Sequence, residues 1–514
     1  MPNENSDPVF QLIKTLTRTE KRHFRLFANR QGSTDGLKFL QLFDALDGQD
    51  RYDEERVLAQ VPAIKKVQVA NLKANLYRQL LASLRMYHAG HNLDIQLHEQ
   101  LDYARVLYNR GLYQQSLRML EKVKAQARQA EMQHIVLLAL EFEKLIEGQY
   151  ITRSLRGRAR QLSDEATDTV RHVGREHELS NLALRMYGRY LKIGHTRNQQ
   201  DHDKITAYFR EGLPVLDPRQ AGFFEQLYYY QAHVWYYTIT QNFRFCFRYA
   251  QKWVDLFEHN PLMREQQAML YIKGLHNLLI TAHNMLYYSK FEQVLAQLEA
   301  YAADPDRRTS PNIEMLLFLY IYTNRLNGYF MRGQFTEGLS IIPELLEKLD
   351  YFRLQLDSHR RLVFYYKIAS LYFGSGQPDK AIEYLNKVIF FKEANLREDI
   401  QCFARILNLI AHYEAGRDES LDYQIRSVYR FLGKLNDQQQ MQEAIFQFLR
   451  TLGDVAPSEL RDAFIELKNQ LIRIAENPYE RRPFLYLDII SWLESKIENV
   501  PVQEVIRRKF RQLK

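Results

Sequence analysis

The sequence predicts an all-α protein assembled from repeated helix pairs. The 514-residue chain contains only 21 Gly and 14 Pro, and so few breakers favour long helices over strands. Residues 365–388 form two helical patterns joined by a turn at Gly374-Ser-Gly376. Similar pairs recur elsewhere, and a repeated helix pair is typical of an α-solenoid, in which each pair packs on its neighbours.

Residues 1–95 are predicted to form a helical N-terminal domain. Asp7 before Pro8 is typical of an N-cap followed by the first helical position. Thr17 and Glu20 have the spacing of a capping box. Residues 31–36 are expected to form a loop. The predicted helices span 8–16, 17–27, 37–46, 53–60 and 65–87.

From residue 96 onward the pattern changes to helix pairs. The best copy places Ile368 and Ala369 in a first helix, then Tyr372, Gly376 at the turn, and Ala381 in the second helix. The small residues let two helices cross closely, and the glycine ends the first helix through a left-handed cap. Less complete copies are centred on Tyr113, Phe243, Phe291 and Phe335. Their expected small or turn residues include Ser116 after Tyr113, Gly333 before Phe335 and, in place of a turn glycine, Ser289 before Phe291.

This order of residues resembles the tetratricopeptide repeat (TPR). Phe243, Phe291, Phe335 and Pro378 follow one another at intervals of 48, 44 and 43 residues, whereas the standard repeat has about 34. We therefore expect a TPR-like α-solenoid with long helices or linkers over 96–440. The tail, 441–514, keeps an apolar helical face without the repeat pattern and is predicted to be a C-terminal helical cap.

The resemblance implies binding, because TPR-like arrays with long helices occur in bacterial peptide-sensing regulators and transcription activators. It also implies that the first helix of each pair lines a concave groove. The partner-binding groove would then contain aromatic and hydrogen-bonding side chains, namely Tyr228, Gln231, Trp235, His276, His283, Tyr320, Thr323, Asn327, Phe330, Tyr366 and Phe373. The Lys and Asn with which chaperone-binding relatives hold a terminal carboxylate are replaced by Tyr366 and Ser370.

Three basic stretches could contact phosphates or could be solvated helix faces paired with acidic residues. They comprise Lys21, Arg22 and Arg25; Arg153, Arg156, Arg158 and Arg160; and Arg507, Arg508 and Lys509. The net charge of +8 is mild for this length. It permits an acidic partner or nucleic acid without requiring either.

Catalytic signatures are scarce. The Gly374–Gly376 turn lacks the third glycine of a dinucleotide loop and the Lys of a P-loop. Cys246 and Cys402 are expected to be buried thiols, and the fifteen histidines lack metal-ligand spacing. We expect no catalytic residues, no metal and no cofactor. The polar N-terminus and the absence of a long apolar run predict no signal peptide and no membrane span, with the cytoplasm as the default compartment.

The first hypothesis is therefore a non-enzymatic scaffold or adaptor that binds a peptide or protein partner in the aromatic groove. The alternative is a regulator that contacts nucleic acid or a ribonucleoprotein through the basic N-terminal domain, with the solenoid as sensor or partner-binding arm. An enzyme is the third and least supported class. The sequence gives neither the partner nor the oligomeric state.

Overall fold

The computed structural model describes residues 7–30, 34–149, 157–217, 221–307, 310–391, 398–416, 425, 440–451, 455, 458–480, 484 and 488–513. All regular structure in these ranges is helical, which confirms the predicted all-α class. The chain divides into two compact units, Met1–Gly174 and Arg175–Lys514. This division does not test the predicted boundaries at 95/96 and 440/441, which stay predictions.

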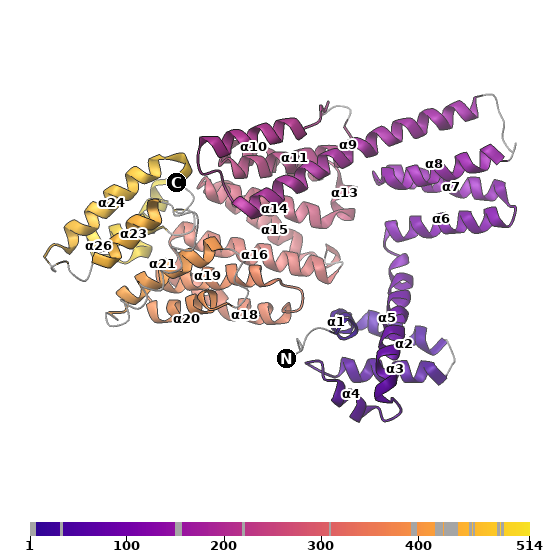
Figure 1. Ribbon diagram of the computed structural model, residues 1–514, viewed down its shortest axis with the longest axis horizontal. Helices are drawn as coiled ribbons and strands as arrows, with labels where there is room; N and C mark the ends of the chain where they lie inside the picture. The colour runs from indigo at the N-terminus through magenta and orange to yellow at the C-terminus, as the bar shows by residue number, and fades with distance from the viewer. Residues whose placement is uncertain are drawn as a thin grey trace. The chain divides into compact units, whose positions relative to one another are not determined.

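The first unit contains eight helices and the start of a ninth (Figure 1). They are α1 (Pro8–Thr15), α2 (Arg18–Arg30), α3 (Thr34–Asp47), α4 (Glu54–Gln60), α5 (Lys66–Ala89), α6 (Leu93–Asn109), α7 (Tyr113–Gln129), α8 (Gln133–Gln149) and α9 (Arg158–Ile193).

Local capping explains where α1 and α2 begin. The Asp7 carboxylate accepts from the N–H groups of Val9 and Phe10, at 3.0 and 2.9 Å. Thr17 N–H donates to Glu20 at 2.7 Å, and Glu20 N–H donates back to the Thr17 hydroxyl at 3.2 Å. Both predicted caps are confirmed. Helix α3 begins at Thr34, three residues before the predicted start. Gly36 therefore lies in the first turn, where backbone N–H groups have no partner within the helix and a glycine is tolerated.

Helices α6, α7 and α8 pack side by side along the chain, and α6 also contacts α8. The turn between α6 and α7 places Gly111 at φ +75°, where glycine avoids the strain of a side chain. Ser116 then donates to the Ala104 carbonyl at 2.8 Å across the two helices. The small residue predicted at this position therefore does allow a close crossing.

The second unit contains the remaining helices. They are α10 (Gln199–Gly212), α11 (Phe223–Ile239), α12 (Phe243–Glu258), α13 (Pro261–Gln266), α14 (Ala268–Asn284), α15 (Tyr288–Ala303), α16 (Pro311–Arg332), α17 (Phe335–Gly338), α18 (Ile342–Tyr351), α19 (Ser358–Gly374), α20 (Pro378–Ile389), α21 (Glu398–Glu414), α23 (Gln440–Thr451), α24 (Leu460–Glu476), α26 (Ile489–Glu498) and α27 (Val502–Leu513). Short 3₁₀ turns lie at Pro305–Arg307, Leu339–Ile341 and Pro478–Glu480.

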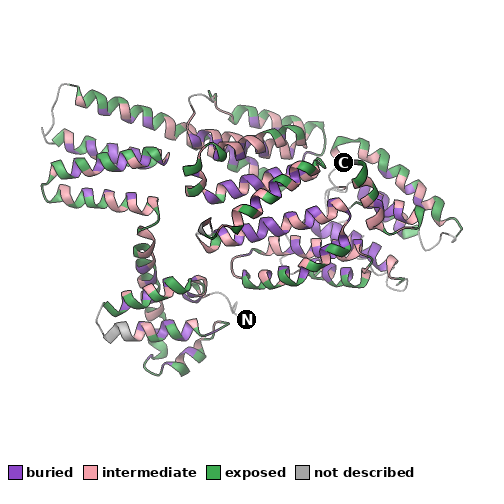
Figure 2. Cartoon of the chain, turned by 180° about the vertical axis from the view of Figure 1, so that it is seen from behind, coloured by how far each residue is buried: buried purple, intermediate pink, exposed green. Residues whose placement is uncertain are grey.

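Neighbouring helices of this unit pack in pairs. Helix α11 packs on α12, α14 on α15 and α19 on α20, while α14 contacts α16, α16 contacts α19 and α19 contacts α21. Their buried residues join into one hydrophobic core that runs from Phe223 to Leu493. Figure 2 shows buried residues where helices face one another and exposed residues on the outer sides. This arrangement is compatible with a helical-repeat solenoid.

The turns differ between the predicted repeat copies in the residue that adopts the left-handed conformation. Gly333 and Gly376 have φ values of +63° and +79°, as predicted for the left-handed caps. In the α14–α15 turn this place is taken by Leu286, at φ +53°. Ser289 lies inside α15, so its predicted equivalence to the turn glycine is wrong. Tyr288, rather than Phe291, is the residue two positions after that turn.

The last helix packs back onto the repeat region, because α27 contacts α16. Arg507 Nε donates to the Gly333 carbonyl at 3.0 Å, and its guanidinium pairs with Glu337 at 2.7 Å. A Cβ on Gly333 would lie 2.6 Å from the Gln503 carbonyl oxygen. Gly333 is therefore required both by its backbone angle and by the close approach of α27.

Candidate partner-binding face

Three helices that pack in order, α14, α16 and α19, join their polar side chains in one network. The His276 ring stacks on Tyr320, with centroids 3.9 Å apart and planes 5° apart. Asn324 Nδ2 lies 3.2 Å from His276 Nδ1, and Asn327 Nδ2 donates to Asn324 Oδ1 at 3.4 Å. Lys367 Nζ completes the network by donating to Asn327 Oδ1 at 2.6 Å.

Aromatic rings lie next to the ammonium groups of two lysines on these helices. Lys367 Nζ lies 5.4 Å from the centroid of the Phe330 ring. Lys273 Nζ lies 5.5 Å from the Tyr187 centroid and 6.0 Å from that of Trp235, and these two rings are 4.7 Å apart. Such cation–π distances are within the attractive range. Rings and ammonium groups therefore share one face.

We call this the α14–α19 face and define it by six partly exposed residues: Trp235, Lys273, His276, Phe330, Arg360 and Lys367. Beneath them Tyr320 and Asn327 are only 9 % and 2 % exposed. The buried pair holds the partly exposed layer in place, because its hydrogen bonds and stacking fix the side chains above it. The exposed layer is the part that a partner can reach.

The face is positively charged. Burial lowers the pKa of Lys367 to about 8, and burial together with Arg360 lowers the pKa of Lys273. No carboxylate of the described residues forms an ion pair with either lysine. Arg360 does have one, Asp357, at 3.3 Å. Lys367, whose pKa of about 8 lies above neutral pH, is therefore a cation there, and neither lysine has an acidic partner within the described ranges.

The histidines of this region are uncharged at neutral pH. Burial, with the charges of Lys367, Arg360 and Lys273, lowers the pKa of His276 to about 3. Burial and Lys367 lower the pKa of His283 to about 4. A neutral imidazole can accept or donate a hydrogen bond without adding charge. His276 therefore provides this face with a neutral aromatic ring and a hydrogen-bonding group.

The structure brings together five of the predicted groove residues: Trp235, His276, Tyr320, Asn327 and Phe330. The others lie differently. Gln231 and Tyr366 are buried, and burial suits packing rather than contact with a ligand. Tyr228 stacks near Phe224 with a centroid distance of 6.1 Å.

His283 and Phe373 complete the predicted set. The His283 Nδ1 atom lies 3.5 Å from Asn284 Oδ1. Phe373 and Thr323 are both partly exposed, and Phe373 packs against the hydrophobic core.

Sequence reasoning missed Lys273, Asn324, Arg360 and Lys367. On α19 the predicted register selected Tyr366 and Ser370, yet Tyr366 is 6 % exposed and Ser370 donates to the Tyr366 carbonyl at 2.9 Å. The partly exposed position is the next one, Lys367. The seven-residue spacing of Arg360 and Lys367 on one predicted helix could have revealed a basic side of α19.

Most of the predicted basic residues have acidic neighbours. The pairs are Lys21 with Asp47, Arg25 with Asp44, Arg158 with Glu143, Arg160 with Asp164, Arg507 with Glu337, Arg508 with Glu498 and Lys509 with Glu494. Arg22 is exposed, and Arg153 and Arg156 lie outside the described residues. These pairs offset the positive charge that phosphate binding would use.

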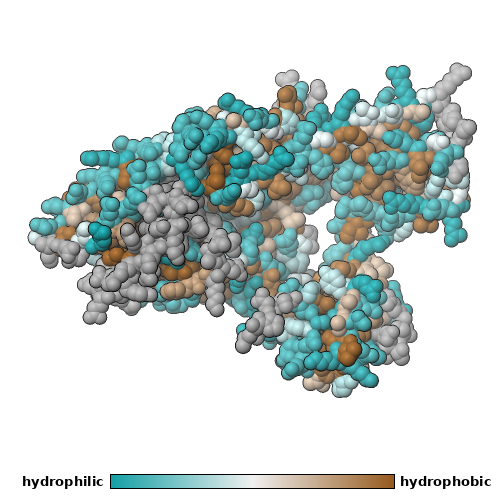
Figure 3. Space-filling view, viewed as in Figure 1, coloured by the Kyte–Doolittle hydropathy of each residue, from teal (hydrophilic) through white to brown (hydrophobic). Residues whose placement is uncertain are grey.

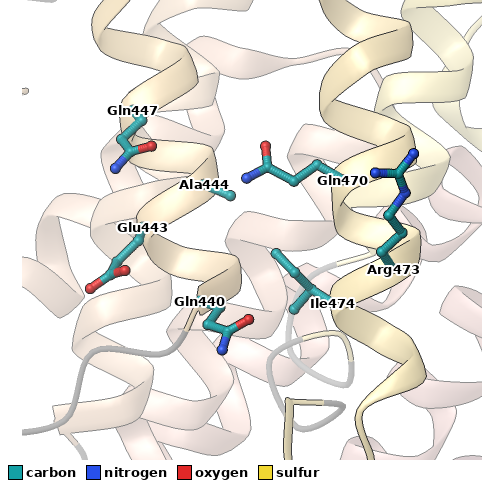
Figure 4. A pocket seen from close by; sticks show the side chains of 7 residues that line it. All are labelled: Gln440, Glu443, Ala444, Gln447, Gln470, Arg473 and Ile474. Atoms are coloured by element: carbon teal, nitrogen blue, oxygen red, sulfur yellow. The ribbon is translucent and has the colours of Figure 1, made fainter.

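A cavity of about 290 Å³ lies between α23 and α24 (Figure 4). Its lining is Gln440, Glu443, Ala444, Gln447, Gln470, Arg473 and Ile474. Most of these side chains are exposed to solvent. The cavity therefore lacks the apolar walls and fixed polar groups typical of a ligand pocket.

A second exposed surface lies in the first unit. Figure 3 shows hydrophobic patches over the layer of α6, α7 and α8, where Tyr103, Val106, Leu138 and Leu145 are exposed. Within the described ranges no group of His, Cys, Asp and Glu has the number needed to hold a metal ion. None of the helices described is both long enough and apolar enough to cross a membrane.

The chain matches no protein-family model, no curated protein and no solved structure. The class follows from the fold alone: an all-α chain whose helices pack in neighbouring pairs.

Proposed function

We propose that the chain is a non-enzymatic, TPR-like repeat scaffold that binds an extended segment of a protein partner on the α14–α19 face. The observation that carries the proposal is the joining of partly exposed rings and polar groups from three helices that pack in order. A segment crossing these helices would bury apolar groups on Trp235 and Phe330, the kind of contact that dominates binding energy.

The polar network supports the same function. Asn324 and Asn327 are buried, but they hold the donors and acceptors of His276 and Lys367 at fixed positions. Fixed hydrogen-bonding groups between aromatic plates suit a peptide, whose backbone needs partners when its side chains are buried. A pre-organised face of this kind also loses little side-chain entropy on binding.

The test is affinity purification from the native cell with wild-type protein and a Trp235→Ala/Phe330→Ala variant. Both rings are partly exposed, so their removal leaves more of the core intact than removal of the buried Tyr320 would. The matched control is Tyr351→Ala, at a tyrosine that is 74 % exposed on α18. We expect the double variant to lose partners that the control retains. Retention of every partner by the double variant would contradict the proposal.

A further inference from the structure

Lys273 and Lys367 are partly buried lysines of the second unit with no acidic partner among the described residues, a property they share with Lys252 and the exposed Lys380, which also lie over rings. Other lysines of this unit do have acidic partners. Lys496 pairs with Glu414 at 2.7 Å, Lys509 with Glu494 at 2.8 Å, and Lys387 with Glu383 at 2.9 Å. Lys367 instead contacts the uncharged Asn327 and the Phe330 ring. The Lys273 ammonium group lies 5.5 Å from the Tyr187 ring centroid and 6.0 Å from that of Trp235.

An unpaired, partly desolvated ammonium group is unfavourable for folding. Removing a charge from water costs free energy unless an opposite charge replaces the lost hydration. Desolvation is the sole cause of the lowered pKa of Lys367. Two such groups on one face are therefore poorly explained by stability, and perturbed groups of this kind cluster at functional sites.

The two lysines act on a common point. Lys367 is linked to His276 through Asn327 and Asn324, and Lys273 precedes His276 by three residues on α14, which places both on one side of that helix. The charges of Lys273, Arg360 and Lys367 accordingly all lower the pKa of His276. Asp357 pairs with Arg360 and offsets one of these charges. His276 is neutral and contributes none. The surroundings of His276 therefore retain an excess of positive charge at neutral pH.

We propose that Lys273 and Lys367 bind the carboxylate side chain of an aspartate or glutamate within an extended peptide on the α14–α19 face. This inference rests on the proposed function and deepens it. The lysines stand on α14 and α19, with α16 between them in the packing order, so the acidic residue would lie across α16. The flanking peptide residues would then meet Trp235 on one side and Phe330 on the other.

A carboxylate fits these groups better than a phosphate does. Phosphate sites favour the planar fork of arginine, which binds two oxygens at once. The only arginine of this face, Arg360, already pairs with Asp357. The remaining donors are two single ammonium groups, which lack that bidentate fork.

The probes are four pools of C-terminally amidated nonapeptides, in which the flanking positions are randomised without Asp or Glu. The central residue is Glu, Gln, Lys or phosphoserine. A fifth pool has central Gln and a free C-terminus. Retention is measured on immobilised full-length wild type, on Lys273→Met/Lys367→Met and on Trp235→Ala/Phe330→Ala. Lys380→Met is the matched control, because this exposed lysine also lies over a ring, Tyr372, at 5.3 Å.

We expect wild type to retain the Glu pool about 10- to 100-fold more tightly than the Gln pool, as for hydrogen bonds to charged groups. The lysine double variant should lose this preference while Lys380→Met keeps it. Thermal unfolding of each variant confirms that it is folded. Equal retention of the Glu and Gln pools, both lost in the ring double variant, would overturn the carboxylate site but leave the proposed function standing.

The other outcomes separate alternative ligands. Preference for the phosphoserine pool would overturn the inference in favour of a phosphopeptide. Preference for the free C-terminus would overturn it in favour of a chain terminus. Retention of no pool above the level seen with the ring double variant would contradict peptide binding itself, and with it the proposed function.

Discussion

Lys367 donates to Asn327 at 2.6 Å, so a lysine whose pKa is lowered to about 8 is held by an uncharged partner. The charges of Arg360 and Lys273 lie in the same neighbourhood, and His276 and His283 face Lys367 as neutral rings. A partly desolvated lysine without an opposite charge costs stability, and under the proposed function this cost would be the trade-off common at binding sites. Removal of the Lys367 charge should therefore change the stability of the protein.

We predict that Lys367→Met raises the free energy of unfolding by about 1–2 kcal/mol at pH 7. Methionine removes the cost of desolvating the charge, which raises the free energy of unfolding by about 3 kcal/mol. Loss of the hydrogen bond to Asn327 lowers it again by about 1 kcal/mol. Urea denaturation measures the effect, with Lys380→Met as the control that leaves stability within about 0.5 kcal/mol of wild type. A clear destabilisation by Lys367→Met would show that the lysine has a structural role.

The contribution of Lys367 to the free energy of unfolding should depend on pH. The pKa of this lysine is about 8 in the folded protein and about 10.4 in an unfolded chain. Between these values the unfolded state binds more protons, so this contribution to stability rises with pH. The gap between Lys367→Met and wild type should therefore narrow from pH 8 to pH 10. An unchanged gap over that range would contradict the lowered pKa.

Acid should destabilise the second unit through histidines whose pKa values are lowered. His276, with a pKa of about 3, stays neutral in the folded protein while the unfolded histidine protonates below about pH 6.5. Its contribution to stability is thus lost as the pH falls from about 6.5 towards 3, by about 1.4 kcal/mol per pH unit. Lys273, Arg360 and Lys367 disfavour the protonated ring throughout that range.

We therefore predict that His276→Gln reduces the slope of the free energy of unfolding against pH between pH 6 and pH 4. The reduction should correspond to the uptake of about one proton, or about 1.4 kcal/mol per pH unit. Glutamine keeps a group that can bond to Asn324, while loss of the stack on Tyr320 costs about 1 kcal/mol at pH 7. Guanidinium denaturation at several pH values measures the slope. His259→Gln, at an exposed histidine after α12, is the control. Equal changes of slope in both variants would contradict the assignment to His276.

Two turn glycines allow a matched comparison. Gly376 has φ +79° and open space around its Cα, so Gly376→Ala should cost only the backbone strain of about 1 kcal/mol. Gly333 has φ +63°, and a Cβ there would lie 2.6 Å from Gln503 O. Gly333→Ala must also displace α27 and lose contacts of Arg507, for a total of about 3 kcal/mol.

Urea denaturation measures both glycine variants, and limited proteolysis reports the release of α27. The prediction is faster cleavage near residues 502–513 in Gly333→Ala alone. Similar stability losses and cleavage rates in the two variants would show that α27 does not pack on this turn.

The first unit contains a buried ion pair that can be tested independently. Lys124 Nζ lies 2.5 Å from Glu143 Oε2, and Glu143 is 0 % exposed. Burial raises the pKa of Glu143 despite this neighbour. Lys124→Met should therefore destabilise the unit by about 3 kcal/mol, because it leaves a buried carboxylate with fewer partners.

Adding Glu143→Leu to Lys124→Met should recover most of that loss, since an apolar pair can replace a buried ion pair at little cost. A double-mutant cycle by urea denaturation measures the coupling. Additive effects of the two substitutions would mean that Lys124 and Glu143 do not interact.

Local features of the fold were predictable from the sequence. The Asp7 cap, the Thr17–Glu20 box and the left-handed glycines at 333 and 376 depend on residues close in the chain. The α14–α15 turn was misplaced because Leu286 occupies a conformation that usually indicates glycine. Residue type alone cannot reveal such a turn, since packing around it supplies the compensating free energy.

The candidate site was only half predictable. The predicted groove included Trp235, His276 and Phe330, which contribute to the candidate face. On α19 it included Tyr366, which is buried, whereas the partly exposed neighbouring position is Lys367. Charge pairing was not predictable at all in cases such as Arg507 and Glu337, which are 170 residues apart. The unpaired state of Lys273 and Lys367 is likewise a tertiary property, because it depends on which acids the fold leaves elsewhere.

The central claim is that a partner peptide lies on the α14–α19 face. The most direct test replaces Phe330, on that face, with photoreactive p-benzoylphenylalanine, and makes the same replacement at the exposed Tyr351 as a control. After irradiation with the Glu-centred peptide pool, mass spectrometry counts the cross-linked protein. We predict cross-links from position 330 that disappear in the Lys273→Met/Lys367→Met background, and none above background from position 351. Equal cross-linking at both positions, or none at 330, would contradict the account.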